Sequence, residues 1–260
     1  MALTFPSKPE IRVKNPPLLE VVCQVKFPPI LSIAKELPSE FQERIRHQFP
    51  ELEVEQGFLV RLPGISNPEI PAAEIQPKIY RFRSSPGFTA ISLAADFYAV
   101  STNHYTHWDD FVGWLRLAQE AAQQVYNLTY SPRIGLRYIN RLTLENTGRK
   151  TAKEMLDLLR PELTAQLHTE AWTEPLEMLN QLLLDNNPAK LSLRTGFGKE
   201  HGEPFFLLDI DYFEEGKLNL DDLVERCNAY HGVIHDAFRW CLRDEAIAAF
   251  GPLIQETHRP

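Results

Sequence analysis

Three arginines stand four positions apart in the middle of the chain, at Arg133, Arg137 and Arg141. The segment that holds them, residues 133–142, is rich in the aliphatic, aromatic and β-branched residues that favour a β-strand. Because the side chains of a strand alternate between its faces, the guanidinium groups are expected on one face, about 13 Å apart. Guanidinium groups bind phosphate and carboxylate through paired hydrogen bonds. The spacing therefore predicts a surface for an anionic group or an acidic protein segment.

The same arginines have a structural interpretation that needs no partner. Acidic residues on neighbouring strands would form a ladder of ion pairs with them across the sheet. Three acids in predicted strands are suited to this role: Asp96, Asp209 and Asp211. The binding interpretation instead groups these residues into one surface: Arg133, Arg137, Arg141, Asn140, Arg81, Arg83 and Arg194. The sequence leaves the ladder and the binding surface open as alternatives.

The face of this strand opposite the arginines is expected to belong to the core. It carries Ile134, Leu136, Tyr138 and Leu142, with Asn140 among them, whereas Gly135 and Ile139 lie between the arginines. Leu136 and Ile139 fall on opposite faces, so only one of them can pack under the helices. We predict that Leu136 is the buried one.

The net charge of the chain limits the classes of partner that it is expected to bind. The chain of 260 residues carries 35 acidic and 27 basic side chains, a net charge of −8. An acidic chain repels the phosphate backbone, so the protein is not expected to bind nucleic acid on its own. A protein partner fits better, either a basic one that meets the overall charge or an acidic segment that meets the arginines.

Other chemistry has little support in the sequence. The cysteines, Cys23, Cys227 and Cys241, are odd in number and lack metal-ligand spacing. His231 and His235 are four apart on a predicted helix, but no third ligand accompanies them, so surface histidines are expected and no metal site. Nucleotide-binding glycine loops and paired catalytic carboxylates are missing. We therefore predict no catalytic residue, metal or cofactor, and we favour a binding protein over an enzyme.

The protein is expected to be cytoplasmic. Its first residues do not form a charged segment followed by an apolar run, as a signal peptide would. Apolar runs stay below the roughly 18 residues of a membrane helix, so membrane insertion is not expected. An odd number of cysteines is consistent with free thiols in a reducing compartment.

The predicted elements divide the chain into an extended arm, residues 1–17, a first half, residues 18–130, and a second half, residues 131–260. In the first half we expect strands at 19–27, 52–62, 78–83 and 88–101, helices at 39–48 and 108–127, and a loop at 63–77. In the second half we expect the arginine strand, two helical pieces within 151–185, a hairpin of 191–197 with 205–213 and a turn at 196–199, and a helix at 220–242 that extends toward residue 250.

The two halves share an element order: strand, helix, at least two hairpin strands and a long helix. Their junctions also match, because Asp96-Phe97-Tyr98 precedes Asp109-Asp110 and Asp211-Tyr212-Phe213 precedes Asp221-Asp222. Such a duplication predicts an α+β fold in which tandem β-α-β(2–4)-α repeats form one antiparallel sheet with long helices on one face. The arrangement would be TATA-binding-protein-like or helix-grip-like.

The runs NPPLLEVV at residues 15–22, Phe27-Pro28-Pro29 and RIGLRYINR at residues 133–141 resemble a sporadically distributed family of uncharacterised bacterial proteins of about 250–280 residues. The resemblance covers most of the chain but not residues 150–205. It implies no activity. Its patchy distribution implies horizontal transfer, which is common for genes linked to defence or toxins.

The first functional hypothesis is a non-enzymatic protein-interaction module, such as an antitoxin or an accessory subunit of a defence-type system. The alternative is a small-ligand binder, since a helix-grip sheet can enclose an apolar cavity. Four tryptophans, Trp108, Trp114, Trp172 and Trp240, would suit such a cavity or the core. A hydrolase or nuclease is the least favoured hypothesis. The partner, the ligand and the oligomeric state are beyond what the sequence determines.

Overall fold

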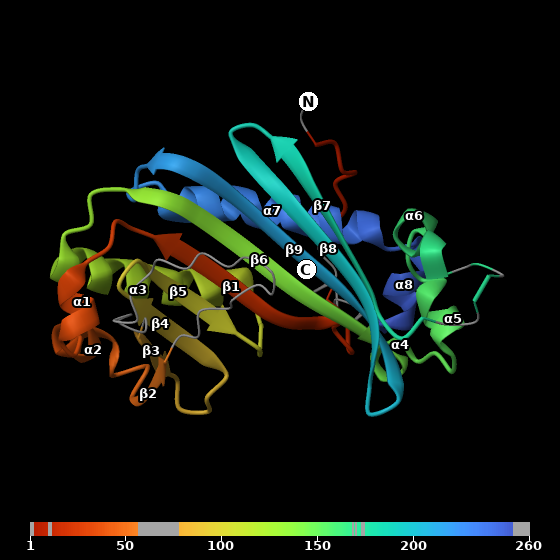
Figure 1. Ribbon diagram of the computed structural model, residues 1–260, viewed down its shortest axis with the longest axis horizontal. Helices are drawn as coiled ribbons and strands as arrows, with labels where there is room; N and C mark the ends of the chain where they lie inside the picture. Colours follow the sequence, from red (N-terminus) through yellow and green to blue (C-terminus); the bar gives the residue numbers. More distant parts are fainter. Residues whose placement is uncertain are drawn as a thin grey trace, which may run out of the picture. The chain divides into compact units, whose positions relative to one another are not determined.

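The structure is a computed structural model that describes residues 3–9, 12–56, 78–167, 169, 171–172 and 175–251 (Figure 1). It has an α+β fold with one nine-stranded sheet in the order β2-β3-β4-β5-β1-β6-β9-β8-β7. Strands that follow one another along the chain, from β2 to β5 and from β7 to β9, pair antiparallel. The predicted class and the antiparallel sheet are confirmed.

The strands are β1 (Leu18–Lys26), β2 (Glu51–Gln56), β3 (Lys78–Arg83), β4 (Thr89–Ala94), β5 (Phe97–Thr102), β6 (Ser131–Thr143), β7 (Met178–Asn186), β8 (Ala189–Glu200) and β9 (Glu203–Leu218). The helices are α1 (Leu31–Lys35), α2 (Ser39–Ile45), α3 (Trp108–Tyr126), α4 (Leu144–Thr147), α5 (Ala152–Leu156), α6 (Pro161–Thr164), α7 (Leu223–Cys241) and α8 (Asp244–Ala249), with a short 3₁₀ turn at Ala165–Leu167.

The chain divides into two compact units that interleave along the sequence. Unit 1 comprises Met1–Val21, Gly135–Glu214 and Glu225–Pro260, and unit 2 comprises Val22–Ile134 and Glu215–Val224. The chain therefore passes from one unit to the other within β1, β6, β9 and α7. Most of the arginine strand, β6, belongs to unit 1.

In unit 2, the helix α3 packs its apolar stripe against the sheet. Phe111, Val112, Leu115, Ala118, Ala121 and Ala122 form the buried stripe of this helix. Trp114 and Val125 lie beside the stripe and are half-buried. Asn127 ends the helix in the left-handed conformation, with φ of 48°, which asparagine adopts more readily than most residues.

The predicted long strand over residues 88–101 is wrong. It is a hairpin, β4 and β5, that turns at Ala95 and Asp96. The turn lacks the glycine or proline that usually marks one, and the buried residues on both sides read as one continuous strand. Backbone after β1 stabilises the turn, because Phe27 N–H donates to the Asp96 carbonyl at 2.9 Å and Ile30 N–H to that of Ala95 at 2.7 Å.

In unit 1, α7 covers one face of the sheet strands. Its buried side chains include Cys227, Tyr230, Ile234, Ala237 and Cys241. Tyr230 meets Tyr212 of β9 edge to face, with ring centroids 5.2 Å apart. Arg226 donates to Glu214 of β9 at 2.6 Å, so an ion pair accompanies the apolar contact. The helix ends at Cys241 and α8 follows separately, although we expected one helix from residue 220.

The second predicted helical piece, up to residue 185, is wrong, because Met178–Asn186 form strand β7. Consecutive leucines at 182–184 suit a helix as well as a strand when the sequence alone is read. The predicted turn at residues 196–199 is also wrong, because it lies within β8. The β8–β9 turn is made by His201 and Gly202, with φ of 52° and 88°.

The N-terminal arm lies along unit 1. Phe5 packs against Trp240 of α7, with ring centroids 5.7 Å apart. Lys8 pairs with Asp244 of α8 at 2.5 Å, and Lys14 N–H donates to the Gly251 carbonyl at 2.7 Å. The predicted loop at residues 63–77 and the end of the predicted strand at 52–62 lie outside the described residues.

Candidate functional site

Strand β6 separates a core face from an arginine face as its sequence predicts. Ile134, Leu136 and Leu142 are fully buried, and Tyr138 and Asn140 are nearly so. Asn140 donates to the Leu208 carbonyl at 3.5 Å, so its amide serves the sheet. The arginines and Ile139 of the other face are half-exposed. The alternation follows directly from the two-residue period of a strand.

On the arginine face of unit 1, two guanidinium groups share one buried carboxylate, and we call Arg137, Arg194 and Asp209 the arginine cluster. Arg137 donates from Nε to Asp209 Oδ1 and from Nη2 to Oδ2, both at 2.6 Å. Arg194 donates from Nη1 to Oδ2 at 3.2 Å. The Asp209 side chain is 3% exposed, whereas that of Arg137 is 40% exposed. The cluster thus holds an arginine in a fixed position at the surface.

The surroundings of Arg137 favour the charged form of its guanidinium group. The hydrogen bonds from Arg137 to Asp209 raise the pKa of Arg137, and Asp211 and Glu20 raise it further, while burial acts in the opposite direction. Arg194 lies directly opposite Asp209 in the β8–β9 ladder, so backbone pairing brings these two residues together. The structure therefore contains a paired arrangement of the kind that the ladder interpretation predicts, centred on Asp209.

The other arginine of β6 in this unit, Arg141, lies over an aromatic ring. Its guanidinium carbon is 4.4 Å from the centroid of Phe205, and its Nη2 donates to Glu200. That hydrogen bond lowers the pKa of the Glu200 carboxyl. The Phe205 ring occupies the space beside Gly198, where an added Cβ would come within 2.9 Å of it. A glycine on β8 thus makes room for the ring that supports Arg141.

Substituting this glycine tests the arrangement. Gly198→Ala is expected to displace the Phe205 ring and the Arg141 side chain and to lower the free energy of unfolding by about 1–2 kcal/mol. Urea unfolding measures the loss. Gly113→Ala is the control, because an added Cβ there meets nothing within 4 Å and alanine favours a helix interior. An unchanged stability in Gly198→Ala would contradict the close packing of Phe205.

The other predicted site residues belong to unit 2. Arg81 pairs with Glu55 at 2.6 Å and Arg83 with Glu53 at 3.0 Å, across the β2–β3 ladder. Arg133 reaches Gln24 of β1 at 3.5 Å. The structure therefore brings Arg137 and Arg194 together, places Arg141 on the same strand face, and groups Arg81 with Arg83 on another strand.

Sequence reasoning missed several partners of these arginines. Glu53, Glu55 and Glu200 were not foreseen, because strand register decides which acid meets which arginine. Among the proposed ladder acids, Asp209 pairs as expected, but Asp96 lies in the β4–β5 turn and not in a strand. Phe205 was missed because an aromatic residue three positions after a turn glycine has no signature of a stacking role.

The histidines and cysteines have structural surroundings. His231 Nδ1 lies 2.8 Å from the Tyr138 hydroxyl, and His235 lies 3.4 Å from Asp236. Both rings are half-buried, so the expectation of surface histidines is only partly right. Among the described residues, His, Cys, Asp and Glu side chains form no group of three that could hold a metal ion. Burial raises the pKa of Cys241 to about 12, which leaves its thiol protonated and unreactive.

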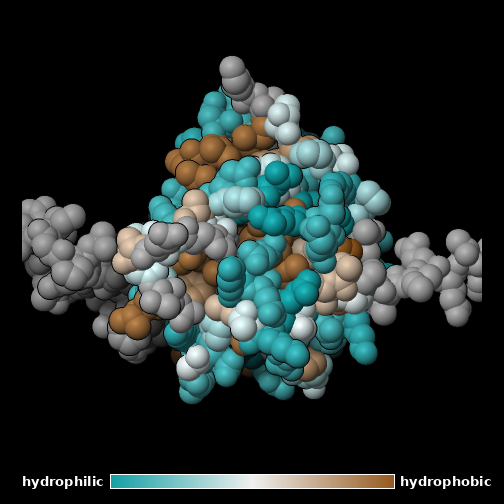
Figure 2. Space-filling model, turned by 90° about the vertical axis from the view of Figure 1, so that its right-hand side faces the viewer, coloured by the Kyte–Doolittle hydropathy of each residue, from teal (hydrophilic) through white to brown (hydrophobic). Residues whose placement is uncertain are grey.

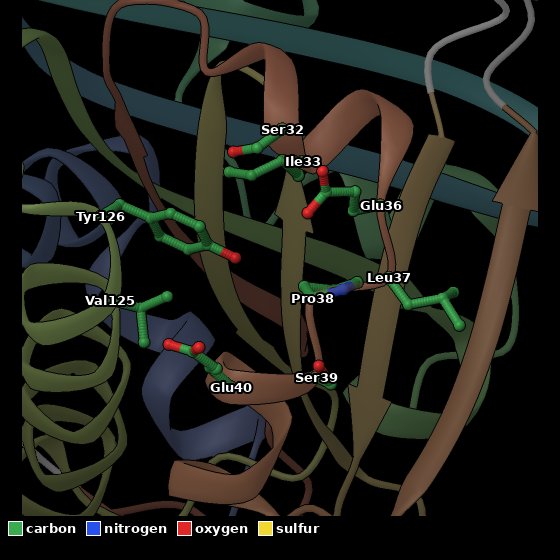
Figure 3. A pocket seen from close by; sticks show the side chains of 9 residues that line it. All are labelled: Ser32, Ile33, Glu36, Leu37, Pro38, Ser39, Glu40, Val125 and Tyr126. Carbon is green, nitrogen blue, oxygen red and sulfur yellow. The ribbon is translucent and has the colours of Figure 1, made fainter.

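A small pocket opens in unit 2 beside α1, α2 and the end of α3 (Figure 3). Its volume is about 220 Å³, and the residues that line it are Ser32, Ile33, Glu36, Leu37, Pro38, Ser39, Glu40, Val125 and Tyr126. Burial raises the pKa of the Tyr126 hydroxyl to about 12, and Glu40 adds to the effect. Ligand pockets usually enclose about 300–1,000 Å³ and are mainly apolar. This pocket gives the small-ligand hypothesis no support.

No protein-family model matches the chain, and no curated protein is similar enough to match. Within the described residues, every helix is too short or too polar to cross a membrane.

Proposed function

We propose that the chain is a non-enzymatic protein-interaction module, and that its binding surface is the arginine face of unit 1. The observation that carries this proposal is the arginine cluster, in which a buried carboxylate orients a guanidinium group that remains 40% exposed. An arginine held in this way loses little conformational freedom when it binds, because its own hydrogen bonds already fix it.

Apolar side chains of β7 lie on the same face. In the β7–β8 ladder Gln181 is opposite Arg194, and Leu179 and Leu183 are the neighbours of Gln181 on that face. Both leucines are exposed. Arginines beside exposed apolar side chains are a composition typical of protein interfaces. Figure 2 views the end of unit 1 that carries α5, α6 and α8, and it shows hydrophobic residues at the surface there as well.

The charges of this face argue for a protein and against nucleic acid as the partner. Arg137 and Arg194 are already matched by Asp209, Arg141 is matched by Glu200, and Asp211 and Glu20 lie close to Arg137. Nucleic-acid binding needs an extended positive field, which this pairing and the net charge of −8 oppose. A protein can instead exchange hydrogen bonds with paired arginines while it covers the leucines.

The test is the capture of a native partner by tagged protein. Arg137→Ala is expected to weaken partner binding at least about tenfold per folded molecule, as the loss of an arginine at the centre of an interface does. Arg116→Ala is the matched control, because that arginine is exposed on α3 of unit 2. Folded protein is quantified by circular dichroism before capture.

Equal capture by Arg137→Ala and wild type would refute the proposed surface. Arg194→Ala gives a second measurement, since Asp209 keeps both hydrogen bonds from Arg137 in that variant. We extend the proposal to an antitoxin or accessory subunit of a bacterial defence-type system, on the basis of the sequence resemblance to the sporadic bacterial family. A partner encoded beside this gene would support that role.

We also propose that the chain arose by duplication, with halves at residues 18–130 and 131–260 after an arm at 1–17, in a TATA-binding-protein-like or helix-grip-like arrangement. Two features of the structure support this: the order of the strands in the sheet and the equal lengths of the two long helices. Outward from β1 the order is β5, β4, β3 and β2, and outward from β6 it is β9, β8 and β7. The last strand before each long helix thus lies beside the first strand of its half, and α3 and α7 each contain 19 residues.

One observation weighs against the duplication as the sequence suggested it. Asp96 lies in a turn, whereas Asp211 lies inside strand β9, so the matched junctions are not equivalent in structure. The proposal therefore depends on element order and sheet order. Failure of the two halves to superpose in an experimental structure would contradict it.

A further inference from the structure

Strand β7 is an edge strand without the features that usually protect an edge. Within the described part of the chain it is the last strand of the sheet, and its nine residues pair with β8 in an unbroken register. Natural edge strands are commonly short or bulged, or they carry lysine or proline, because exposed backbone groups can recruit another strand. The sequence MLNQLLLDN contains no lysine, arginine or proline and one acid, Asp185.

The opposite edge of the sheet is protected. Strand β2 has six residues, and three of them are Glu51, Glu53 and Glu55. Pairing this edge with a second copy of itself would bring several carboxylates together. The chain therefore has one edge that charge protects and one that is apolar, with Leu179, Leu182 and Leu183 exposed by 70%, 51% and 61%.

The order of residues in β7 suits antiparallel pairing with a second copy of the same strand. With Leu183 opposite its own copy, Leu182 meets Leu184, Gln181 meets Asp185, and Asn180 meets Asn186. Apolar residues thus face apolar residues, and polar residues face polar ones. The two Asp185 carboxylates lie four residues apart along the strands, about 13 Å, so like charges do not meet.

We propose that β7 is a dimerisation strand, which pairs antiparallel with β7 of a second copy of this chain about a two-fold axis at Leu183. An axis perpendicular to the sheet keeps the arginine face of both copies on one side. A contact of this kind is closed by its own symmetry, whereas pairing of β7 with β2 of another copy would continue into a filament. The three glutamates of β2 disfavour that second mode.

The area that would be buried suits a weak dimer. With the axis at Leu183, residues 180–186 of the two strands overlap over about 23 Å, so an edge about 10 Å deep presents about 230 Å². The exposed leucines within this overlap, Leu182 and Leu183, add roughly another 200 Å² of aliphatic area. The total of about 430 Å² per copy lies below the standard size of a specific interface, in the range of weak contacts. We therefore expect a dimer that forms with rising concentration.

Disulfide cross-linking tests the register. Leu183→Cys is expected to form a covalent dimer under mild oxidation, because residues directly opposite in an antiparallel pair have Cα atoms about 5 Å apart, within disulfide range. Leu179→Cys is the matched control on the same strand and face, since its copy lies about 27 Å away. The native cysteines, Cys23, Cys227 and Cys241, are fully buried and do not compete.

Sedimentation of the purified protein, without any partner, tests the dimer itself. Wild type is expected to shift from monomer toward dimer between ~1 and ~100 µM, and Leu183→Lys is expected to stay monomeric because two lysines would meet at the axis. Leu52→Lys, on the other edge strand, should behave like wild type. A monomeric wild type over this range, a dimer unchanged by Leu183→Lys, or equal cross-linking of both cysteine variants would overturn the proposal. Partner capture is not involved, so this outcome is independent of the proposed function.

Discussion

Replacing Asp209 with asparagine is expected to lower the free energy of unfolding by about 3 kcal/mol, the lower end of the range for breaking a buried ion pair. The carboxylate is 3% exposed and accepts three hydrogen bonds from two arginines. An amide keeps the size of the side chain but removes its charge, and it brings N–H donors toward guanidinium donors. Both arginines can still be hydrated at the surface, which keeps the loss from being larger.

Urea unfolding of Asp209→Asn measures this loss. Asp185→Asn, the same change on an exposed position of β7, is the control and should stay within about 0.5 kcal/mol of wild type. Arg137→Ala should cost less than Asp209→Asn, about 1–3 kcal/mol, because Arg194 still satisfies the carboxylate. An Asp209→Asn variant as stable as wild type would show that the buried carboxylate does not hold the arginine cluster together.

Both interpretations of the arginine strand, the ion-pair ladder and the binding surface, describe part of the structure. Asp209 pairs within the sheet as a ladder predicts, and Arg137 stays partly exposed as a binding surface requires. The free energy of unfolding and the binding of the partner must therefore be measured separately for each variant. Arg137→Ala is informative only when capture is normalised to folded protein, whereas Arg194→Ala leaves the bidentate pair of Arg137 and Asp209 in place.

The sequence predicted those parts of the fold that local periodicity determines. The faces of β6 and the helix α3 follow from alternation and from helical spacing, and both agree with the burial of Leu136 and Leu115. Partner choice depends on register between strands that are far apart in the chain, such as Arg137 with Asp209 and Arg141 with Glu200. One sequence does not fix that register.

The errors have the same physical origin. Leucines at 182–184 suit a helix by propensity, but pairing with β8 makes them part of a strand whose edge remains exposed. Ala95 and Asp96 form a turn without glycine or proline because the backbone after β1 hydrogen-bonds to their carbonyl groups. In both cases a long-range contact overrides the local preference. The exposure of the β7 leucines and the sharing of the Asp209 carboxylate both depend on which strands lie side by side.

Replacing Leu136 with alanine is expected to lower the free energy of unfolding by about 2–5 kcal/mol, because a fully buried leucine loses its packing and leaves a cavity. Leu136 and Ile139 lie three residues apart on opposite faces of β6, and Ile139 is only half-buried. Ile139→Ala should therefore cost clearly less, about 1 kcal/mol.

Urea unfolding of both variants compares the two faces directly. Two changes from a large aliphatic residue to alanine, in one strand, differ mainly in what covers the side chain. Equal losses would mean that the arginine face is packed as tightly as the core face, and a partner would then find no surface there. A larger loss for Leu136→Ala, together with normal partner capture by that variant at temperatures where it is folded, would separate the core of the sheet from the face that binds.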